Sequence, residues 1–356
     1  MSGLDLVLAA RQGSVENVQA LLDSGVSVDC YMYRERFSAL ESAARRGNDD
    51  VVRLLLKNHA TVDLPNDLNQ TALFAAASLG NLSTVRILIM EGDATVVDWT
   101  DCCARTPLYF AARGMHMEVV KYLIEEGKAD VDAQENGAST ALWYAVNNDH
   151  SELVKYLVEA HARIDFDALA NAAHGKLHIL QYLLQNQTSC DVNQTDSQGD
   201  SLIHHAASNG SSKVVRFLIE KCGSKVNHVR HDGITPFFIA CLNGRVAVAR
   251  YLSKQKGVNI NRTRRLPYTA ATPLHVACRC QHGNIVRWML EDGTLAVDLT
   301  KKDCFGQTAR DCAKLDHQPI FDAYYHKRWD LVVHLASKNW FDEGTGRSKT
   351  KKSSTG

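Results

Sequence analysis

Apolar and small residues recur along the chain in a repeated pattern. Residues 106–132 read TPLYFAARGMHMEVVKYLIEEGKADVD, and near-copies begin at residues 71 and 140. Each copy holds a short apolar stretch with alanines, a polar break, and further apolar residues spaced three or four positions apart. That spacing is typical of one face of an α-helix. The pattern therefore predicts two short antiparallel helices in every copy.

The residues that bound these helices fit the same interpretation. Thr106 is suited to the N-cap, and Pro107 to the first helical position, where a missing N–H costs nothing. Ala111 and Ala112 leave room for a neighbouring backbone, and Gly127 ends the second helix. Because the two apolar faces of such a pair point to opposite neighbours, a single copy cannot bury both. The copies must stack.

The repeated unit resembles the ankyrin repeat, which pairs D-x-x-G-x-T-P-L-H-x-A-A with a second helix ending in L-L-x-x-G-A. The resemblance is carried by DSQGDSLIHHAASNG from residue 196, DGITPFFIACLNG from residue 232 and TPLHVAC from residue 272. It covers about residues 4–325, and one gap between unit starts is of double length. The resemblance implies an all-α ankyrin repeat solenoid of about ten helix-turn-helix units with short turn fingers.

Departures from the family pattern predict the internal divisions. The unit at about 166–193 lacks the Thr-Pro start and reads as one residue short between its helices, which predicts the weakest joint. The C-terminal tail is polar, basic and without apolar periodicity, which favours disorder. The expected parts are a solenoid at 1–325, with an N-terminal cap at about 1–30 and a C-terminal cap at about 304–325, then a helix at 326–341 and a disordered basic tail at 342–356.

Three non-glycine residues stand where the family has the glycine between its two helices. Met115, Asp149 and Gln281 occupy these positions. A left-handed backbone is expected there, and these side chains adopt it less readily than glycine. A small local cost in stability follows.

Charge and targeting signals narrow the function classes. Lys and Arg total 40, as do Asp and Glu, so no large field of one sign favours nucleic acid or a membrane surface. No apolar run reaches the roughly 18 residues of a membrane span, and the N-terminus lacks signal-peptide features. We expect a monomeric cytoplasmic protein with free thiols, and the basic tail leaves a nuclear location open.

Neither a metal nor a cofactor is expected. The segment CRCQH at 278–282, followed by Cys304, lacks the paired spacing of a zinc site. Cys278 takes a small-residue packing position. The adjacent Cys102 and Cys103 fall at a turn tip, where an exposed thiol pair is expected and redox sensitivity requires acidifying neighbours.

No catalytic constellation is recognisable. His204 and His275 match the histidine of T-P-L-H, and the resemblance implies that they hydrogen-bond between adjacent turns. The chain has no phosphate-binding loop, nucleophile elbow, zinc-protease or kinase motif. The sequence therefore favours a non-catalytic scaffold or adaptor that binds another protein. The alternatives are a substrate receptor of a ubiquitin ligase and an enzyme whose site is assembled across repeats.

The resemblance also implies a binding surface on the turn fingers and the concave side of the first helices. A solvated surface is the alternative for each residue. Trp143, in place of a turn histidine, is expected to pack between turns. The candidate partner-binding residues are Arg34, Phe37, Arg45, Arg46, Leu68, Leu79, Arg105, Arg113, Asn147, Asn148, Asn209, His231, Asn243, Arg262, Arg264, Arg265, Tyr268 and Arg279.

One turn among these is longer than its neighbours. It contains Arg262, Arg264 and Arg265, followed by Pro267 and Tyr268. Arginine donates paired hydrogen bonds to carboxylates and phosphates. An acidic or phosphorylated segment of a partner protein is therefore the expected ligand of this turn.

Overall fold

The computed structural model describes residues 2–32, 36–92, 97–187, 191–265, 270–313 and 318–324, and throughout this part of the chain the regular elements are helices. Isolated bridges such as Tyr31 with Ser38 close individual turns. The chain divides into two compact units, Met1–Cys190 and Asp191–Gly356. The all-α ankyrin-type fold expected from the sequence is confirmed.

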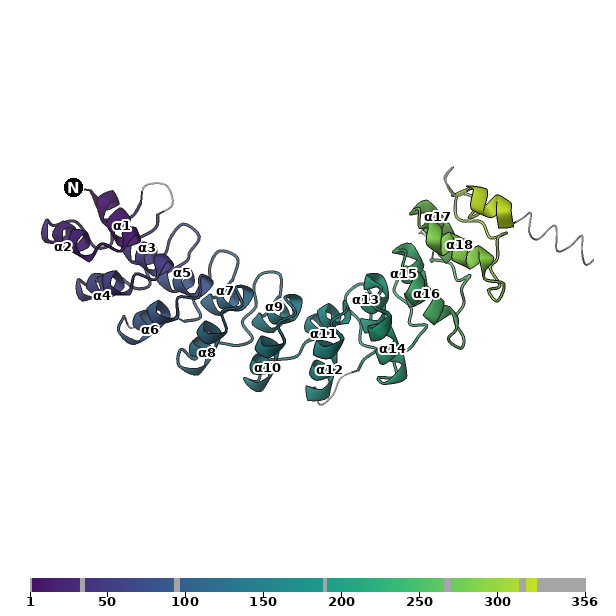
Figure 1. The fold of residues 1–356 in the computed structure, drawn as a ribbon, viewed down its shortest axis with the longest axis horizontal. Coiled ribbons are helices and arrows are strands. Elements are labelled where there is room, and N and C mark those ends of the chain that lie inside the picture. Colours follow the sequence, from purple (N-terminus) through teal and green to yellow (C-terminus); the bar gives the residue numbers. More distant parts are fainter. Residues whose placement is uncertain are drawn as a thin grey trace, which may run out of the picture. The chain divides into compact units, whose positions relative to one another are not determined.

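In the first unit the helices come in antiparallel pairs. Odd-numbered helices form one row and even-numbered helices a second row (Figure 1). Their bounds are α1 (Gly3–Gln12), α2 (Val15–Asp23), α3 (Ala39–Arg46), α4 (Asp49–Lys57), α5 (Ala72–Ser78), α6 (Leu82–Met90), α7 (Pro107–Arg113), α8 (Met117–Glu125), α9 (Ala141–Asn147), α10 (Ser151–Glu159), α11 (Phe166–Ala173) and α12 (Leu177–Asn186).

The second unit repeats this arrangement. Residues 318–324 are also helical, whereas the helix expected at 326–341 and the tail at 342–356 lie outside the described residues. The bounds are α13 (Leu202–Asn209), α14 (Ser212–Glu220), α15 (Pro236–Leu242), α16 (Val246–Ser253), α17 (Pro273–Arg279) and α18 (Gly283–Glu291).

Side-chain caps define where the first helices begin. The hydroxyl of Thr106 accepts a hydrogen bond from the backbone N–H of Tyr109 at 3.2 Å, and Pro107 is the first residue of α7. Thr140 and Thr235 cap α9 and α15 in the same way. Each cap satisfies one backbone donor that the helix leaves unpaired. The predicted helix starts are confirmed.

The repeated small and apolar residues are the stacking faces. Ala111 and Ala112 of α7 are fully buried, and α7 contacts both α5 and α9. Val120 and Leu123 of α8 are also fully buried, and α8 packs beside α6. Truncating a buried leucine of this kind to alanine typically costs about 2–5 kcal/mol. The apolar pattern is thus explained by contacts between neighbouring pairs.

The links between paired helices adopt the left-handed backbone that the sequence predicts. Met115, Asp149 and Gln281 have φ angles of 59°, 56° and 59°. Gly47 has a φ of 70° at the equivalent position of an earlier pair. The three non-glycine residues therefore carry backbone strain that glycine would avoid.

The irregular unit at about 166–193 is shorter than its neighbours, but not at the place that the sequence predicted. Residues 174–176 join α11 to α12, just as residues 148–150 join α9 to α10, so the expected shortening between the paired helices is wrong. The missing residues precede the unit, since residues 160–165 join α10 to α11 where residues 126–140 join α8 to α9. Asp165 caps α11 by accepting from the N–H of Ala168 at 2.8 Å. The unit therefore has both helices, but no finger precedes its first helix.

Candidate functional site

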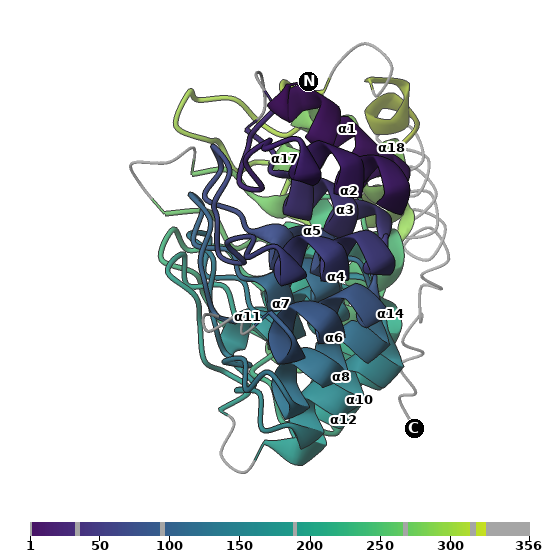
Figure 2. The same ribbon diagram turned by 90° about the vertical axis from the view of Figure 1, so that its left-hand side faces the viewer.

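The turns that join one helix pair to the next, here called fingers, project to one side of the helices in the first unit (Figure 2). The finger that precedes α7 is built around Asp101, whose side chain is fully buried. One carboxylate oxygen accepts the backbone N–H groups of Cys103 at 2.9 Å and Arg105 at 3.0 Å. The other accepts from the Arg105 guanidinium at 2.7 Å and the Gln70 amide at 2.9 Å. These four contacts hold the backbone of the finger in one conformation.

These contacts also set the charge of Asp101. Burial alone would raise the pKa of its carboxyl, but hydrogen bonds from Arg105, Gln70 and the backbone hold that pKa below its ordinary value. The carboxylate consequently stays ionised near neutral pH. It serves the finger as a structural acceptor and not as a proton donor or acceptor in chemistry.

Other fingers use the same acceptor position. Asn66 accepts the backbone N–H groups of residues 68 and 70, Asp196 those of 198 and 200, and Asp303 those of 305 and 307. A side-chain oxygen that accepts two N–H groups further along is a local turn-forming device. The recurring Asp or Asn of the repeat thus orders the finger that follows it.

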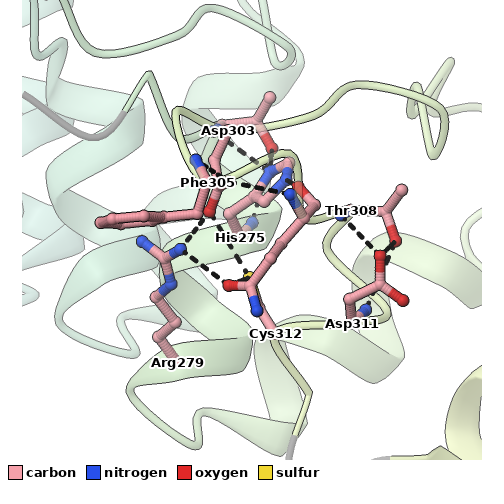
Figure 3. A network of polar contacts seen from close by, with 9 residues as sticks. His275, Arg279, Asp303, Phe305, Thr308, Asp311 and Cys312 are labelled. Atoms are coloured by element: carbon pink, nitrogen blue, oxygen red, sulfur yellow. Dashed lines mark hydrogen bonds and ion pairs between the residues drawn. The ribbon is translucent and has the colours of Figure 1, made fainter.

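The finger at 303–307 joins a network of polar contacts in the second unit (Figure 3). The buried carboxylate of Asp303 forms an ion pair with Arg279 of α17. A ring nitrogen of His275 lies 3.0 Å from the carbonyl oxygen of Gln307, which confirms for this histidine the predicted link between adjacent turns. Phe305 is 71% exposed, and its ring centroid lies 5.7 Å from the Arg279 guanidinium. Burial lowers the pKa of His275. This histidine is a structural link.

The predicted partner-binding residues differ in exposure. Arg34 and Tyr268 lie outside the described residues. The exposed ones are Arg46, Leu68, Leu79, Arg113, Asn147, Asn148, Asn209, His231 and Arg265, and the half-buried ones are Phe37, Arg45, Arg105, Asn243, Arg262, Arg264 and Arg279.

Four of the half-buried arginines hold internal ion pairs. Arg45 pairs with Glu41 at 3.1 Å, Arg105 with Asp101, Arg264 with Asp232 at 2.8 Å, and Arg279 with Asp303. In the long turn at 254–272, this pairing ties Arg264 to the preceding finger, while Arg265 is exposed. Sequence alone does not separate the two roles, because adjacent arginines look alike until the acidic partner is located.

A hollow of about 460 Å³ lies at the N-terminal end of the first unit. The hollow is lined by Leu8, Arg11, Gln12, Arg46 and Asn48, which come from α1, the end of α3 and the link between α3 and α4. Leu8 is 39% exposed. Leu8 and Arg11 are not among the binding residues predicted from the sequence. Their place on the first helix, which has a stacked neighbour on one side only, was the available signal. The hollow combines apolar surface with two guanidinium groups.

Aromatic side chains connect α5, α7 and α9 of the first unit. Phe74 meets Phe110 with ring centroids 5.8 Å apart, and Tyr109 meets Tyr144 at 4.8 Å. Trp143 lies edge-on to its neighbour Tyr144 in the same helix, with ring centroids 4.9 Å apart, and its packing between turns stays a prediction. Phe110 and Tyr144 remain half-buried. This row offers apolar contact area to a ligand while its rings hold one another in place.

Comparison with known families identifies the fold. A family model described as "Ankyrin repeats (3 copies)" matches residues 6–98, 75–169, 168–264 and 222–303. The chain therefore belongs to the ankyrin repeat family. Ankyrin repeats are binding units and are not catalytic in themselves. Among the described residues, no helix is long and apolar enough to cross a membrane.

Individual relatives share only part of their length with this chain. It is 34% identical over 125 residues to E3 ubiquitin-protein ligase XBAT33 of Arabidopsis thaliana, a match that covers 34% of this chain and 23% of the relative. It is 32% identical over 119 residues to Ankyrin repeat and KH domain-containing protein mask-1 of Caenorhabditis elegans, covering 33% of this chain and 4% of that protein. The chain thus spans about a quarter or less of these relatives.

Proposed function

We propose that this chain is a non-catalytic scaffold or adaptor that binds a partner protein on the first-helix surface of its first unit. The supporting observation is the basic and apolar hollow lined by Leu8, Arg11 and Arg46. Leu79 and Arg113, both exposed at the ends of α5 and α7, continue the same kind of surface. Apolar and arginine side chains together are favourable contacts at interface centres.

The chemistry of this surface favours an acidic partner segment that also carries apolar residues. Exposed guanidinium groups donate strong, often paired hydrogen bonds to carboxylates or phosphates. Exposed leucines and half-buried aromatic rings supply apolar contact. Arg265 of the long turn is a further exposed cation for such a segment, whereas Arg264 already has its acidic partner.

The test is a charge reversal on this surface with a matched control. The double variant Arg46→Glu and Arg113→Glu should weaken capture of partner proteins from native cells by about tenfold or more, because repulsion is added to lost contacts. The control, Lys57→Glu with Arg86→Glu, makes the same change in charge at exposed positions of α4 and α6. Equal loss of partners in both variants would point to net charge alone, and unchanged capture in the first variant would move the contact surface elsewhere.

A second candidate function is that of a substrate receptor in ubiquitin ligation. It is favoured by the similarity to XBAT33, which is named an E3 ubiquitin-protein ligase, over about a third of this chain. If it holds, a ubiquitin ligase should co-purify with the chain, and partners lost in the charge-reversal variant should accumulate when that variant replaces the natural chain. Co-purification of partners without any ligase component would favour the scaffold alone.

A further inference from the structure

Two adjacent thiols lie together on one finger of the first unit. The Sγ atoms of Cys102 and Cys103 are 3.9 Å apart. Cys102 is exposed and Cys103 half-buried, so both can be reached from solvent. Within the described residues, they and Asp101 are the group of potential metal ligands whose donor atoms all lie within 4.8 Å of one another. The finger therefore presents a preassembled pair of sulfur atoms.

The backbone on both sides holds this pair in place. The N–H of Cys102 donates to the carbonyl oxygen of Leu68 in the preceding finger at 3.0 Å, and the carbonyl oxygen of Cys103 accepts from Asn136 in the following finger at 3.0 Å. The N–H of Cys103 donates to the buried Asp101 carboxylate. Because neighbouring fingers restrain both residues, little conformational freedom is lost when a ligand bridges the two sulfurs.

The separation of the sulfurs matches a chelated metal better than a disulfide. Two zinc–sulfur bonds of about 2.3 Å at a tetrahedral angle place their sulfurs about 3.8 Å apart. A disulfide requires a sulfur–sulfur distance of about 2.05 Å, so the two sulfurs would have to move closer together. The oxygens of Asp101 already accept hydrogen bonds from Cys103, Arg105 and Gln70. The chain would therefore supply two sulfur ligands to a bound ion, and water would fill the other coordination positions of that ion.

We propose that Cys102 and Cys103 form a two-sulfur site for a soft, thiophilic centre, either a divalent ion such as Zn²⁺ or Cd²⁺ or trivalent arsenic. On binding a divalent ion, both thiols release their protons to solvent and two sulfur–metal bonds form. With an organic arsenoxide, each thiol loses its hydrogen, two sulfur–arsenic bonds form, and the oxygen leaves with both hydrogens as water. No atom changes oxidation state. The site departs from the expectation that the chain holds no metal, under which Cys102 and Cys103 were an exposed thiol pair at a turn tip.

The experiment uses the full-length reduced chain and two probes, Cd²⁺ and phenylarsine oxide. Native mass spectrometry should detect one bound probe per chain, retained in the presence of excess monothiol. Cys102→Ser and Cys103→Ser should each lower the affinity about 100-fold or more, because a single sulfur loses the advantage of two-point attachment. Cys280→Ser and Cys304→Ser, which remove other exposed cysteines, are the matched controls and should leave the affinity unchanged.

The outcomes separate the two kinds of centre and can refute the site. Tight binding of both probes supports a general two-sulfur site, and binding of phenylarsine oxide alone restricts it to arsenic. The proposal is overturned if neither probe binds, if the single serine variants bind as tightly as the natural chain, or if Cys280→Ser causes the loss. Circular dichroism of each variant checks folding. Should a serine variant unfold, the same comparison is made with Cys102→Ala, an exposed position where the sulfur alone is removed.

Discussion

At the scale of single residues, the clearest anomaly is Glu41 of α3. It occupies the position that His275 takes in α17, but its carboxylate is 1% exposed. One oxygen accepts from Arg45 at 3.1 Å and Asn66 at 3.0 Å, while the other oxygen has no hydrogen-bond partner. Burial raises the pKa of Glu41 from 4.5 to about 7 despite these two partners. A buried carboxylate with an unpaired oxygen is costly when ionised.

This shift predicts a pH-dependent stability. Because the pKa of Glu41 in the folded chain lies above the unfolded value, the native state holds the proton more tightly. Its stabilising contribution is complete below pH 4.5 and is lost as the pH rises through 7. Relative to Glu41→Gln, the free energy of unfolding of the natural chain should fall by about 1–3 kcal/mol between pH 5 and 8. Urea unfolding across this range measures it.

The control for this prediction is Glu16→Gln, which changes an exposed carboxylate of α2. Its difference from the natural chain should stay nearly constant over the same pH range. Parallel pH profiles for the natural chain and Glu41→Gln would contradict the assignment.

At the scale of elements, the finger depends on its buried acidic residue. Asp101→Ala removes the acceptor of the Cys103 and Arg105 N–H groups and leaves the Arg105 guanidinium without its partner. We expect a loss of about 1–3 kcal/mol in the free energy of unfolding. Asp67→Ala is the matched control, because its carboxylate is 54% exposed and pairs with Arg36 only at 3.6 Å. A comparable loss in the control would show that the buried network is not the cause.

For the link between paired helices we predict a substitution that raises the free energy of unfolding. Met115 holds a φ of 59° at a position where other pairs have glycine. Met115→Gly relieves the left-handed strain and should stabilise the chain by about 0.5–1 kcal/mol. Met117→Gly, at the first residue of α8, has no left-handed strain to relieve and should not stabilise the chain. Thermal unfolding of the two variants distinguishes them, and a destabilising Met115→Gly would refute the strain argument.

Some features of the elements could be predicted from the sequence and others could not. Helix starts, stacking faces and left-handed links follow from local chemistry at residues such as Thr106, Ala112 and Gln281, and they were predicted correctly. The pairing of Arg264 with Asp232 was not, because the two residues come from different fingers and meet only after stacking. The lost finger before α11 was misplaced for a related reason. When a unit is shorter than the repeat pattern, the missing residues can be placed before or after a helix until the bounds of that helix are known.

At the scale of the whole molecule, the chain consists of two compact units that meet in the sequence directly after the irregular repeat. In a repeat protein each pair contacts mainly its neighbours, so stability is close to a sum of pair terms and nearest-neighbour terms. The irregular repeat lacks the finger through which other units exchange hydrogen bonds. Cooperative unfolding should therefore be interrupted near residues 166–193.

This predicts two separable transitions that respond to different mutations. Leu123 of α8 and Leu218 of α14 are both fully buried, and each truncation to alanine should cost about 2–5 kcal/mol within its own unit. Leu123→Ala should lower the unfolding midpoint of peptides from the first unit and leave those from the second unit nearly unchanged, and Leu218→Ala should do the reverse. Hydrogen exchange at increasing urea, measured peptide by peptide, resolves the two units. If either variant shifts both sets of peptides equally, the chain unfolds as one cooperative block, and the missing finger does not interrupt the coupling between its repeats.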